Sequence, residues 1–284
     1  MPSEVVIDVA GLRMRYGATD VLHGVTFRCR RGEVLAVLGP NGAGKTTTIE
    51  ILEGFRTRSA GHVEVLGADP ATAGEEWRAR VGVVLQAWRD QGKWRVRELL
   101  AQVGAHYETP WDTDELMTTV GLADQRIRTL SGGQRRRLDV AIGIAGRPDV
   151  LFLDEPTTGF DPEARRDFHE LIRGLAAEHG TTILLTTHDL DEAERLAGRI
   201  LVLDAGRIVA DGTAAELARR IAGRDEVRWT LRGERFARPT DGPARLVHDL
   251  YREHGDDLHD LEVRRASLEE TYLSLVRQAE GAGR

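Results

Sequence analysis

The residues best suited to chemistry lie in one glycine-rich segment, residues 39–46, whose sequence is GPNGAGKT. Glycines at this spacing let consecutive backbone N–H groups turn inward around a bound anion, and a helix that follows directs its positive end at the same anion. Lys45 supplies a compact positive charge to the β- and γ-phosphates of a nucleoside triphosphate, and Thr46 offers a hydroxyl to Mg²⁺. The predicted nucleotide contacts in this segment are Gly39, Pro40, Asn41, Gly42, Ala43, Gly44, Lys45, Thr46 and Thr47.

Two carboxylates, Asp154 and Glu155, follow the apolar run Val150–Leu153. Unpaired charge at the end of a buried strand is costly, so a bound cation is the natural reason for the first of them. We predict that Asp154 holds Mg²⁺, directly or through water, and that Glu155 acts as general base toward the attacking water. Alone, such a pair is more often a solvated turn, but the phosphate loop upstream favours the catalytic interpretation.

A third segment, Leu130–Gln134, reads LSGGQ. Ser131 stands where a helix N-cap belongs, ahead of an apolar helical face, so a glycine-containing helix start is the simplest interpretation. Its place after a helical stretch, about 20 residues before Leu151, makes it similar to the signature of the ABC ATPase family. The resemblance covers roughly residues 4–222. It implies contacts to nucleotide bound by another subunit from Ser131, Gly132, Gly133 and Gln134.

Further single positions match the family pattern. By that resemblance Tyr16 stacks on adenine, although a half-buried aromatic at a sheet edge would look the same in sequence. Gln86 corresponds to the glutamine that senses Mg²⁺ and the attacking water, and His188 corresponds to the histidine that contacts the γ-phosphate. Asp161 corresponds to the loop that couples the two sites of a dimer, and Phe160 stands there in place of the leucine common in the family.

These motifs need rigid elements to position them, and the sequence predicts strands and helices in alternation. The clearest helix starts at Asp161, with Pro162 in its first turn, and closes at Gly180. Strand, helix and strand in succession predict an α/β fold with a mostly parallel, buried sheet. Strand-like alternation or short apolar runs occur at residues 5–10, 25–29, 34–38, 62–66, 81–85, 150–153, 182–186 and 199–203.

We therefore expect a P-loop NTPase of the RecA-like type with an antiparallel β subdomain, an inserted helical subdomain and a small C-terminal α+β appendix. Strand signals vanish over about residues 87–147, where helical patterns take over. After about residue 222 the pattern changes again, so the predicted domains are an ATP-binding cassette over 1–222 and an appendix over 225–284. A last amphipathic helix is predicted from Ser267.

Composition limits the classes of protein that fit. The 284 residues carry a formal net charge of −7, which argues against a nucleic-acid binder, and the single cysteine, Cys29, fits a reducing compartment. The N-terminus lacks the charge and the apolar run of a signal peptide, and no apolar run reaches the length of a membrane-spanning helix. We expect a cytoplasmic protein, and the family resemblance implies that an integral-membrane partner holds it at the inner face of the cell membrane.

The resemblance implies an ATP-binding and ATP-hydrolysing subunit of an ABC transporter, which powers export of a drug, antibiotic or lipid-like substrate through a separate permease. Residues 261–272 look like the tail of ATPases in daunorubicin-resistance exporters. ATP and Mg²⁺ are the implied cofactors, and the implied partner is a second ABC ATPase subunit, expected to be another copy of this chain. Trp88 and Trp94 either mark the permease contact or pack into the helical subdomain.

Two other functions stay open at this point. A soluble ABC-type ATPase acting on nucleic acid or the ribosome would share the motifs, but such proteins carry long inserts or paired cassettes. The triplet Arg135–Arg137 could touch phosphate in that setting, whereas in a transporter we predict a solvated helix face. A regulatory module that holds ATP without hydrolysing it is disfavoured by the presence of both Glu155 and His188.

Overall fold

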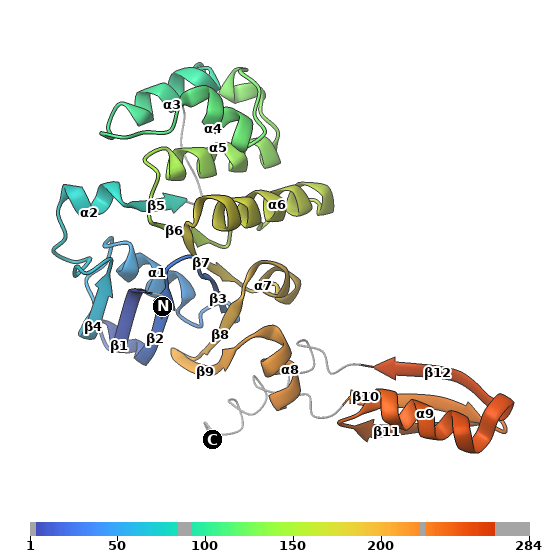
Figure 1. Ribbon diagram of the computed structural model, residues 1–284. Helices are drawn as coiled ribbons and strands as arrows, with labels where there is room; N and C mark the ends of the chain where they lie inside the picture. The colour runs from blue at the N-terminus through green and yellow to red at the C-terminus, as the bar shows by residue number, and fades with distance from the viewer. Residues whose placement is uncertain (1–3, 85–91, 222–224, 265–284) are drawn as a thin grey trace. The chain divides into compact units, whose positions relative to one another are not determined.

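The computed structural model describes residues 4–84, 92–221 and 225–264. The chain separates into two compact units, one over residues 1–211 and one from residue 212 onward. The N-terminal unit contains two sheets and most of the helices, and the C-terminal unit contains a third sheet (Figure 1).

The main sheet of the N-terminal unit has its strands in the order β5-β6-β7-β3-β8-β9. From β5 to β8 the neighbours run parallel, and the register places Leu184 opposite Leu35 and Leu151 opposite Ile183. All of β7 is buried, which is why its side chains form an apolar run with threonines rather than an alternating pattern. The strands are β3 (Val34–Leu38), β5 (Val81–Val84), β6 (Val150–Asp154), β7 (Thr182–Thr187), β8 (Arg199–Asp204) and β9 (Arg207–Gly212).

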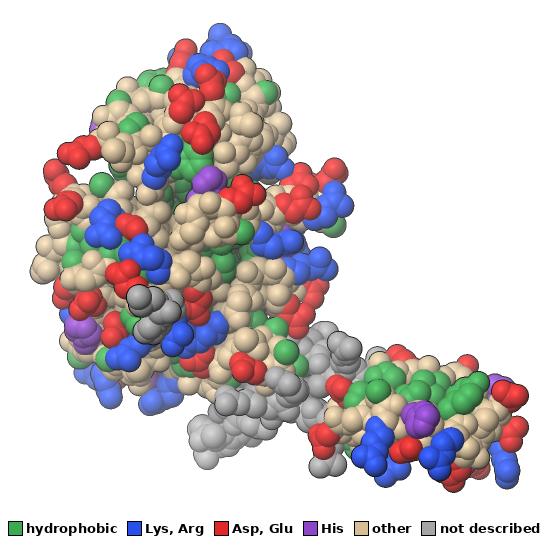
Figure 2. Space-filling model, viewed as in Figure 1, with side chains coloured by type: hydrophobic (Ala, Val, Ile, Leu, Met, Phe, Trp, Pro, Cys, Tyr) green, Lys and Arg blue, Asp and Glu red, His purple; other side chains and the backbone are tan. Residues whose placement is uncertain are grey.

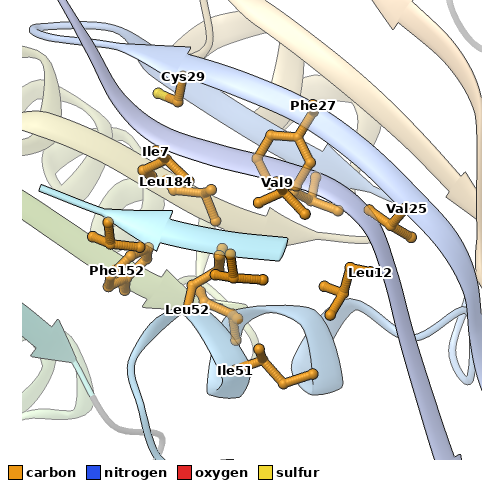
Figure 3. Packing of buried hydrophobic residues seen from close by; sticks show 14 of the residues in the cluster. Ile7, Val9, Leu12, Val25, Phe27, Cys29, Ile51, Leu52, Phe152 and Leu184 are labelled. Atoms are coloured by element: carbon orange, nitrogen blue, oxygen red, sulfur yellow. The ribbon is translucent and has the colours of Figure 1, made fainter. Parts of the chain in front are cut away.

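The second sheet of this unit is antiparallel, in the order β2-β1-β4, and it confirms the predicted β subdomain. Figure 3 shows its side chains Ile7 and Phe27 in one hydrophobic cluster with Leu52 and with Phe152 of β6. Cys29 is buried in the same cluster, so it is a core residue of a strand. The elements are β1 (Val5–Tyr16), β2 (Thr19–Arg30), β4 (Ala60–Val65) and helix α1 (Lys45–Leu52).

Helices replace strands between β5 and β6, as predicted. Helix α6 begins where the Asp161 carboxylate accepts the backbone N–H of Ala164 at 2.8 Å, and it ends at Gly180 with φ of 65°. None of the described helices combines the length and apolarity that crossing a bilayer requires. The helices are α2 (Glu75–Ala79), α3 (Val96–Gly104), α4 (Thr113–Thr119), α5 (Gly132–Ile144), α6 (Pro162–His179) and α7 (Leu190–Leu196).

The C-terminal unit is an α+β structure, with an antiparallel sheet in the order β11-β10-β12. Val227 of the central strand and Leu250 of helix α9 are buried and supply the core of this small unit. The helix predicted from Ser267 lies outside the described residues. The elements are α8 (Ala214–Ile221), β10 (Asp225–Leu231), β11 (Glu234–Thr240), α9 (Pro243–His254) and β12 (Leu258–Arg264).

Strands β9 and β11 and helices α2, α7 and α8 are not among the elements expected from the sequence. Strand β11 is an edge strand that contains Pro239 and exposes nearly all of its residues, so it carries no apolar alternation. Helices α2 and α7 have 5 and 7 residues, which is too short for a helical period to be visible.

Candidate active site

The carboxyl ends of β3, β6 and β7 meet at one edge of the main sheet, because these strands are parallel neighbours. The phosphate loop follows β3, the carboxylates Asp154 and Glu155 end β6, and His188 follows β7. The backbone N–H of Gly39 donates to the Thr187 carbonyl oxygen at 3.2 Å, which joins two of these ends directly. The topology therefore brings together motifs that are far apart in the sequence.

The phosphate loop is held from behind by β8 and by the turn that follows it. A Cβ atom at Gly39 would lie 2.2 Å from the Leu203 carbonyl oxygen, so only glycine fits there. The N–H of Gly206 donates to the Ala43 carbonyl at 3.0 Å, and Gly44 starts α1 with φ of 103°. These contacts hold the loop backbone against β8 and the turn that follows it.

The side chain of Lys45 is buried against the phosphate loop that precedes it. The side chain is 4% exposed, and Nζ donates to the carbonyl oxygens of Gly39 at 2.8 Å and Pro40 at 3.1 Å. Nζ also lies 3.1 Å from Oε1 of Glu155, which links the phosphate loop to the end of β6. A nucleotide phosphate that reaches Lys45 therefore competes with a carboxylate already in place.

Asp154 is surrounded by hydroxyl groups. Thr46 Oγ1 lies 3.1 Å from its Oδ2 and 3.4 Å from its Oδ1, and the Thr186 hydroxyl donates to Oδ1. Carboxylate and hydroxyl oxygens are the hard donors that Mg²⁺ prefers, so Thr46 and Asp154 fit the ion that the sequence predicts for them.

Glu155 adopts a left-handed backbone conformation, with φ of 42°, which is uncommon for a residue other than glycine. Its N–H donates to the Thr186 hydroxyl at 3.0 Å and to the Thr186 carbonyl at 3.1 Å. Its Oε2 lies 3.1 Å from Nδ1 of His188 and accepts a hydrogen bond from Thr158 at 3.3 Å. Burial alone would raise the pKa of Glu155, but Lys45 and then His188 lower it below its usual value, so the carboxylate is ionised at neutral pH.

The signature segment forms a capped helix start, as predicted. The Ser131 hydroxyl accepts the N–H of Gln134 at 3.2 Å, and the Gln134 side chain accepts the N–H of Ser131 at 3.0 Å. Ser131, Gly132 and Gly133 line a cavity of about 580 Å³ together with Glu155 and Asp161. Within the described residues, no hydrogen bond joins Ser131–Gln134 to the phosphate loop.

The prediction of a solvated face for Arg135–Arg137 is wrong for its middle member. Arg136 is 7% exposed, its Nε donates to the Pro156 carbonyl at 3.0 Å, and its guanidinium lies 3.7 Å from Asp139. Arg136 shares a helical stripe with Val140, four residues on, which could have revealed its inward direction. Burial raises the pKa of Asp139 to about 6, although Arg136 opposes that shift.

Tyr16 ends β1 and is 38% exposed, with the Arg56 guanidinium over its ring. Trp94 is likewise 38% exposed, whereas Gln86 and Trp88 lie outside the described residues. Thr186 and Thr158 complete the surroundings of Glu155 although the sequence did not single them out. For Thr186, the available signal was a pair of threonines at the end of a mostly apolar strand, just before His188.

A glycine loop that opens a helix, with an acidic pair at the end of a neighbouring parallel strand, defines a P-loop nucleoside triphosphatase. The family model described as ABC transporter matches residues 22–158. The chain is 42% identical over 233 residues to the Nod factor export ATP-binding protein I of Ralstonia nicotianae, covering 79% of this chain and 72% of that protein. It is 43% identical over 239 residues to the daunorubicin resistance ATP-binding protein DrrA3 of Streptomyces coeruleorubidus, covering 81% and 75%.

Solved structures agree with these relatives. An ATP-binding subunit of an ABC transporter superposes with a TM-score of 0.70 at 25% identity, over 95% of this chain and 99% of the other. The cbiO1 protein of Clostridium perfringens, part of the cbiONQ transporter complex, gives 0.67 at 26% identity, over 75% and 90%. The chain therefore belongs to the ATP-binding proteins of the ABC transporter family. It binds ATP and is an ATPase, and the resemblance expected from the sequence is confirmed.

Proposed function

We propose that this chain hydrolyses ATP between two copies of itself and thereby drives export through a separate permease. One observation carries the proposal. Five side chains from two strand ends and one helix start form a continuous set of contacts at one edge of the sheet: Lys45, Thr46, Asp154, Glu155 and His188. The cassette over 1–222 contains this set, and the appendix over 225–284 is assigned to no step.

The roles of these residues follow from their positions. Lys45 exchanges its loop carbonyls and Glu155 for phosphate oxygens, and the N–H groups of the loop bind the same phosphates. Thr46 and Asp154 would hold Mg²⁺, together with Gln86, and the ion would neutralise charge on the transferring phosphoryl group. Released from Lys45, Glu155 accepts a proton from the attacking water, and His188, at 3.1 Å in the present arrangement, orients that carboxylate and meets the γ-phosphate.

A second copy of the chain completes the site. The exposed start of helix α5 at Ser131 carries N–H groups and a hydroxyl that can stabilise a γ-phosphate, yet within the described chain it has no hydrogen bond to the phosphate loop. We assign Ser131, Gly132, Gly133 and Gln134 to the nucleotide of the partner copy, and Asp161 to the coupling of the two sites. Tyr16 is assigned to adenine.

Export is supported by the relatives, whose names describe Nod factor export and daunorubicin resistance. We propose that the permease holds this chain at the cytoplasmic face of the membrane and selects the substrate, of drug, antibiotic or lipid-like type. The half-exposed Trp94 is proposed to contribute to the permease contact together with Trp88.

The phosphate cradle is tested by Lys45→Ala, with Lys93→Ala as the matched control. Lys93 is the only other lysine of the chain and its side chain is exposed. Calorimetry is expected to show at least a tenfold weaker affinity for ATP in Lys45→Ala and no change in Lys93→Ala, since only Lys45 meets phosphate. Equal affinities in the two variants would overturn the proposed role of Lys45.

The dimer is tested in a Glu155→Gln background, in which hydrolysis is expected to stop. Light scattering should then show that ATP with Mg²⁺ converts monomer to dimer. Adding Ser131→Arg should prevent the dimer while the affinity of the monomer for ATP stays the same, because Ser131 meets only the nucleotide of the partner. A dimer that forms equally well with Ser131→Arg would refute the proposed arrangement.

A further inference from the structure

One face of the Tyr16 ring is covered by a cation. The guanidinium carbon of Arg56 lies 5.0 Å from the ring centroid, within the range of a cation–π contact. Tyr16 is still 38% exposed, so the ring keeps area available for a ligand. It stands at the end of β1, before the turn at Gly17, where φ is 58°.

Arg56 is itself held in place by Glu50. The Arg56 Nε donates to Glu50 Oε2 at 2.7 Å, and the backbone N–H groups of Phe55 and Arg56 donate to the Glu50 carbonyl at 2.9 and 3.1 Å. The intervening Gly54 has φ of 79°, and a Cβ atom there would lie 2.6 Å from the Pro70 carbonyl oxygen. The turn that carries Arg56 therefore has little freedom to move.

Helix α1 connects this turn to the phosphate loop. Lys45 is the first residue of α1 and Glu50 follows five residues later, about 7.5 Å along the helix axis. The phosphate cradle lies at the start of α1, whereas Arg56 follows its end. Gly44 lies against Leu22 of β2, and β2 starts just after Tyr16, so the ring stands at the beginning of a strand that contacts the cradle. Because Arg56 covers one face of the ring, the opposite face is the one left for the nucleotide base.

We propose that Arg56, anchored by Glu50, is a positioning residue that sets the affinity of this site for adenine. The proposal rests on the proposed role of Tyr16. The Arg56 cation on one face of the ring fixes the ring in one orientation and draws electron density from it. Both effects favour stacking of adenine on the opposite face. Arg56 follows the end of α1, whereas the phosphate cradle is at its start, so we expect Arg56 to act on the base alone.

The test compares two ligands on the full-length chain, ATP and tripolyphosphate, which has the phosphates but no base. Arg56→Ala should weaken ATP binding about two- to fivefold in calorimetry and leave tripolyphosphate binding unchanged. Glu50→Gln should weaken ATP binding in the same sense, and Arg56→Lys should restore part of the affinity because it keeps the charge. Arg15→Ala removes a neighbouring exposed cation that pairs with Asp20, and should leave the ratio of the two affinities unchanged.

Tyr16→Ala separates this proposal from the function on which it rests. In that background, Arg56→Ala should have no further effect on ATP affinity, because its only route to adenine is the ring. An unchanged or tighter ATP affinity in Arg56→Ala, or an equal loss for tripolyphosphate, would overturn the role of Arg56. If Tyr16→Ala itself leaves ATP affinity intact while Lys45→Ala abolishes it, the adenine platform fails and the phosphate site stands. If the unsubstituted chain did not bind ATP, the proposed function itself would be refuted.

Discussion

Replacing Glu155 by glutamine should make ADP bind more tightly, even though the variant cannot hydrolyse ATP. The reason is the contact between Lys45 Nζ and Glu155 Oε1 at 3.1 Å, which a β-phosphate must displace. Both side chains are shielded from water, with exposures of 4% and 17%, so solvent screens the pair only weakly. The substitution keeps the shape of the side chain and removes its charge.

The size of the effect can be worked from the partners of each group. A hydrogen bond to a charged group contributes about 1.5–3 kcal/mol. The lower end applies, because a glutamine oxygen can still accept from Lys45 and because Lys45 keeps its bonds to the Gly39 and Pro40 carbonyls. About 1.5 kcal/mol corresponds to about tenfold in affinity.

Calorimetry with ADP is the suitable assay, because ADP has no γ-phosphate to draw two copies of the chain together. Thr158→Ala is the matched control: Thr158 donates to Oε2 of Glu155, whereas the described partners of Lys45 Nζ are Gly39, Pro40 and Glu155, so ADP affinity should stay the same. If Glu155→Gln bound ADP no more tightly than the unsubstituted chain, the idea that Glu155 and nucleotide compete for Lys45 would be refuted.

Three further predictions concern the buried groups around the site. Arg136→Met should lower the free energy of unfolding in urea by about 3 kcal/mol, because Asp139 is left buried without its partner, whereas the partly exposed Arg137→Met should cost under about 1 kcal/mol. Burial raises the pKa of Asp139 to about 6 from 3.8, so its protonated form favours folding. Relative to Asp139→Asn, the stability of the unsubstituted chain should fall by about 2 kcal/mol as the pH rises from about 4 to about 7, measured from unfolding curves at each pH. Gly39→Ala should lower the free energy of unfolding by about 1–3 kcal/mol, seen as a lower melting temperature, and should weaken ATP binding. The reason is that the new Cβ would lie 2.2 Å from the Leu203 carbonyl oxygen.

Each of these has an outcome that contradicts it. An Arg136→Met variant as stable as Arg137→Met would show that the buried guanidinium makes no net contribution. Parallel curves of stability against pH for the unsubstituted chain and Asp139→Asn would mean that Asp139 titrates at its ordinary pKa. Unchanged melting and ATP affinity in Gly39→Ala would mean that the loop can shift away from β8.

The parts of the site that depend on neighbouring residues could be predicted from the sequence. A phosphate loop can be recognised from the sequence, because the glycine motif, the strand before it and the helix after it are consecutive in the chain. The same holds for the caps of Ser131 and Asp161, whose partners lie three residues away. Local hydrogen bonds leave a local pattern of residue types.

The contacts between distant segments could not be predicted in the same way. Lys45 contacts Glu155, and Thr186 contacts Asp154, because β3, β6 and β7 are neighbours in the sheet. The sequence of a single strand does not reveal which strands lie beside it. Arg136 was misjudged because its two arginine neighbours suggested a charged face, although the helical period placed it inward. The proposed contact of Ser131 with a second copy could not be read from contacts within one chain, since among the described residues no hydrogen bond joins Ser131 to the phosphate loop.

The support that Leu203 and Gly206 give to the phosphate loop has a consequence for how this protein meets nucleotide. Since the backbone is already in place, arrival of ATP rearranges side chains, above all Lys45, and little conformational entropy is lost by the main chain. The backbone conformation of residues 42–45 should therefore change little between the free chain and the ATP-bound chain. The difference between the free and the ATP-bound site then lies mainly in the charged side chains that change partners, Lys45 and Glu155.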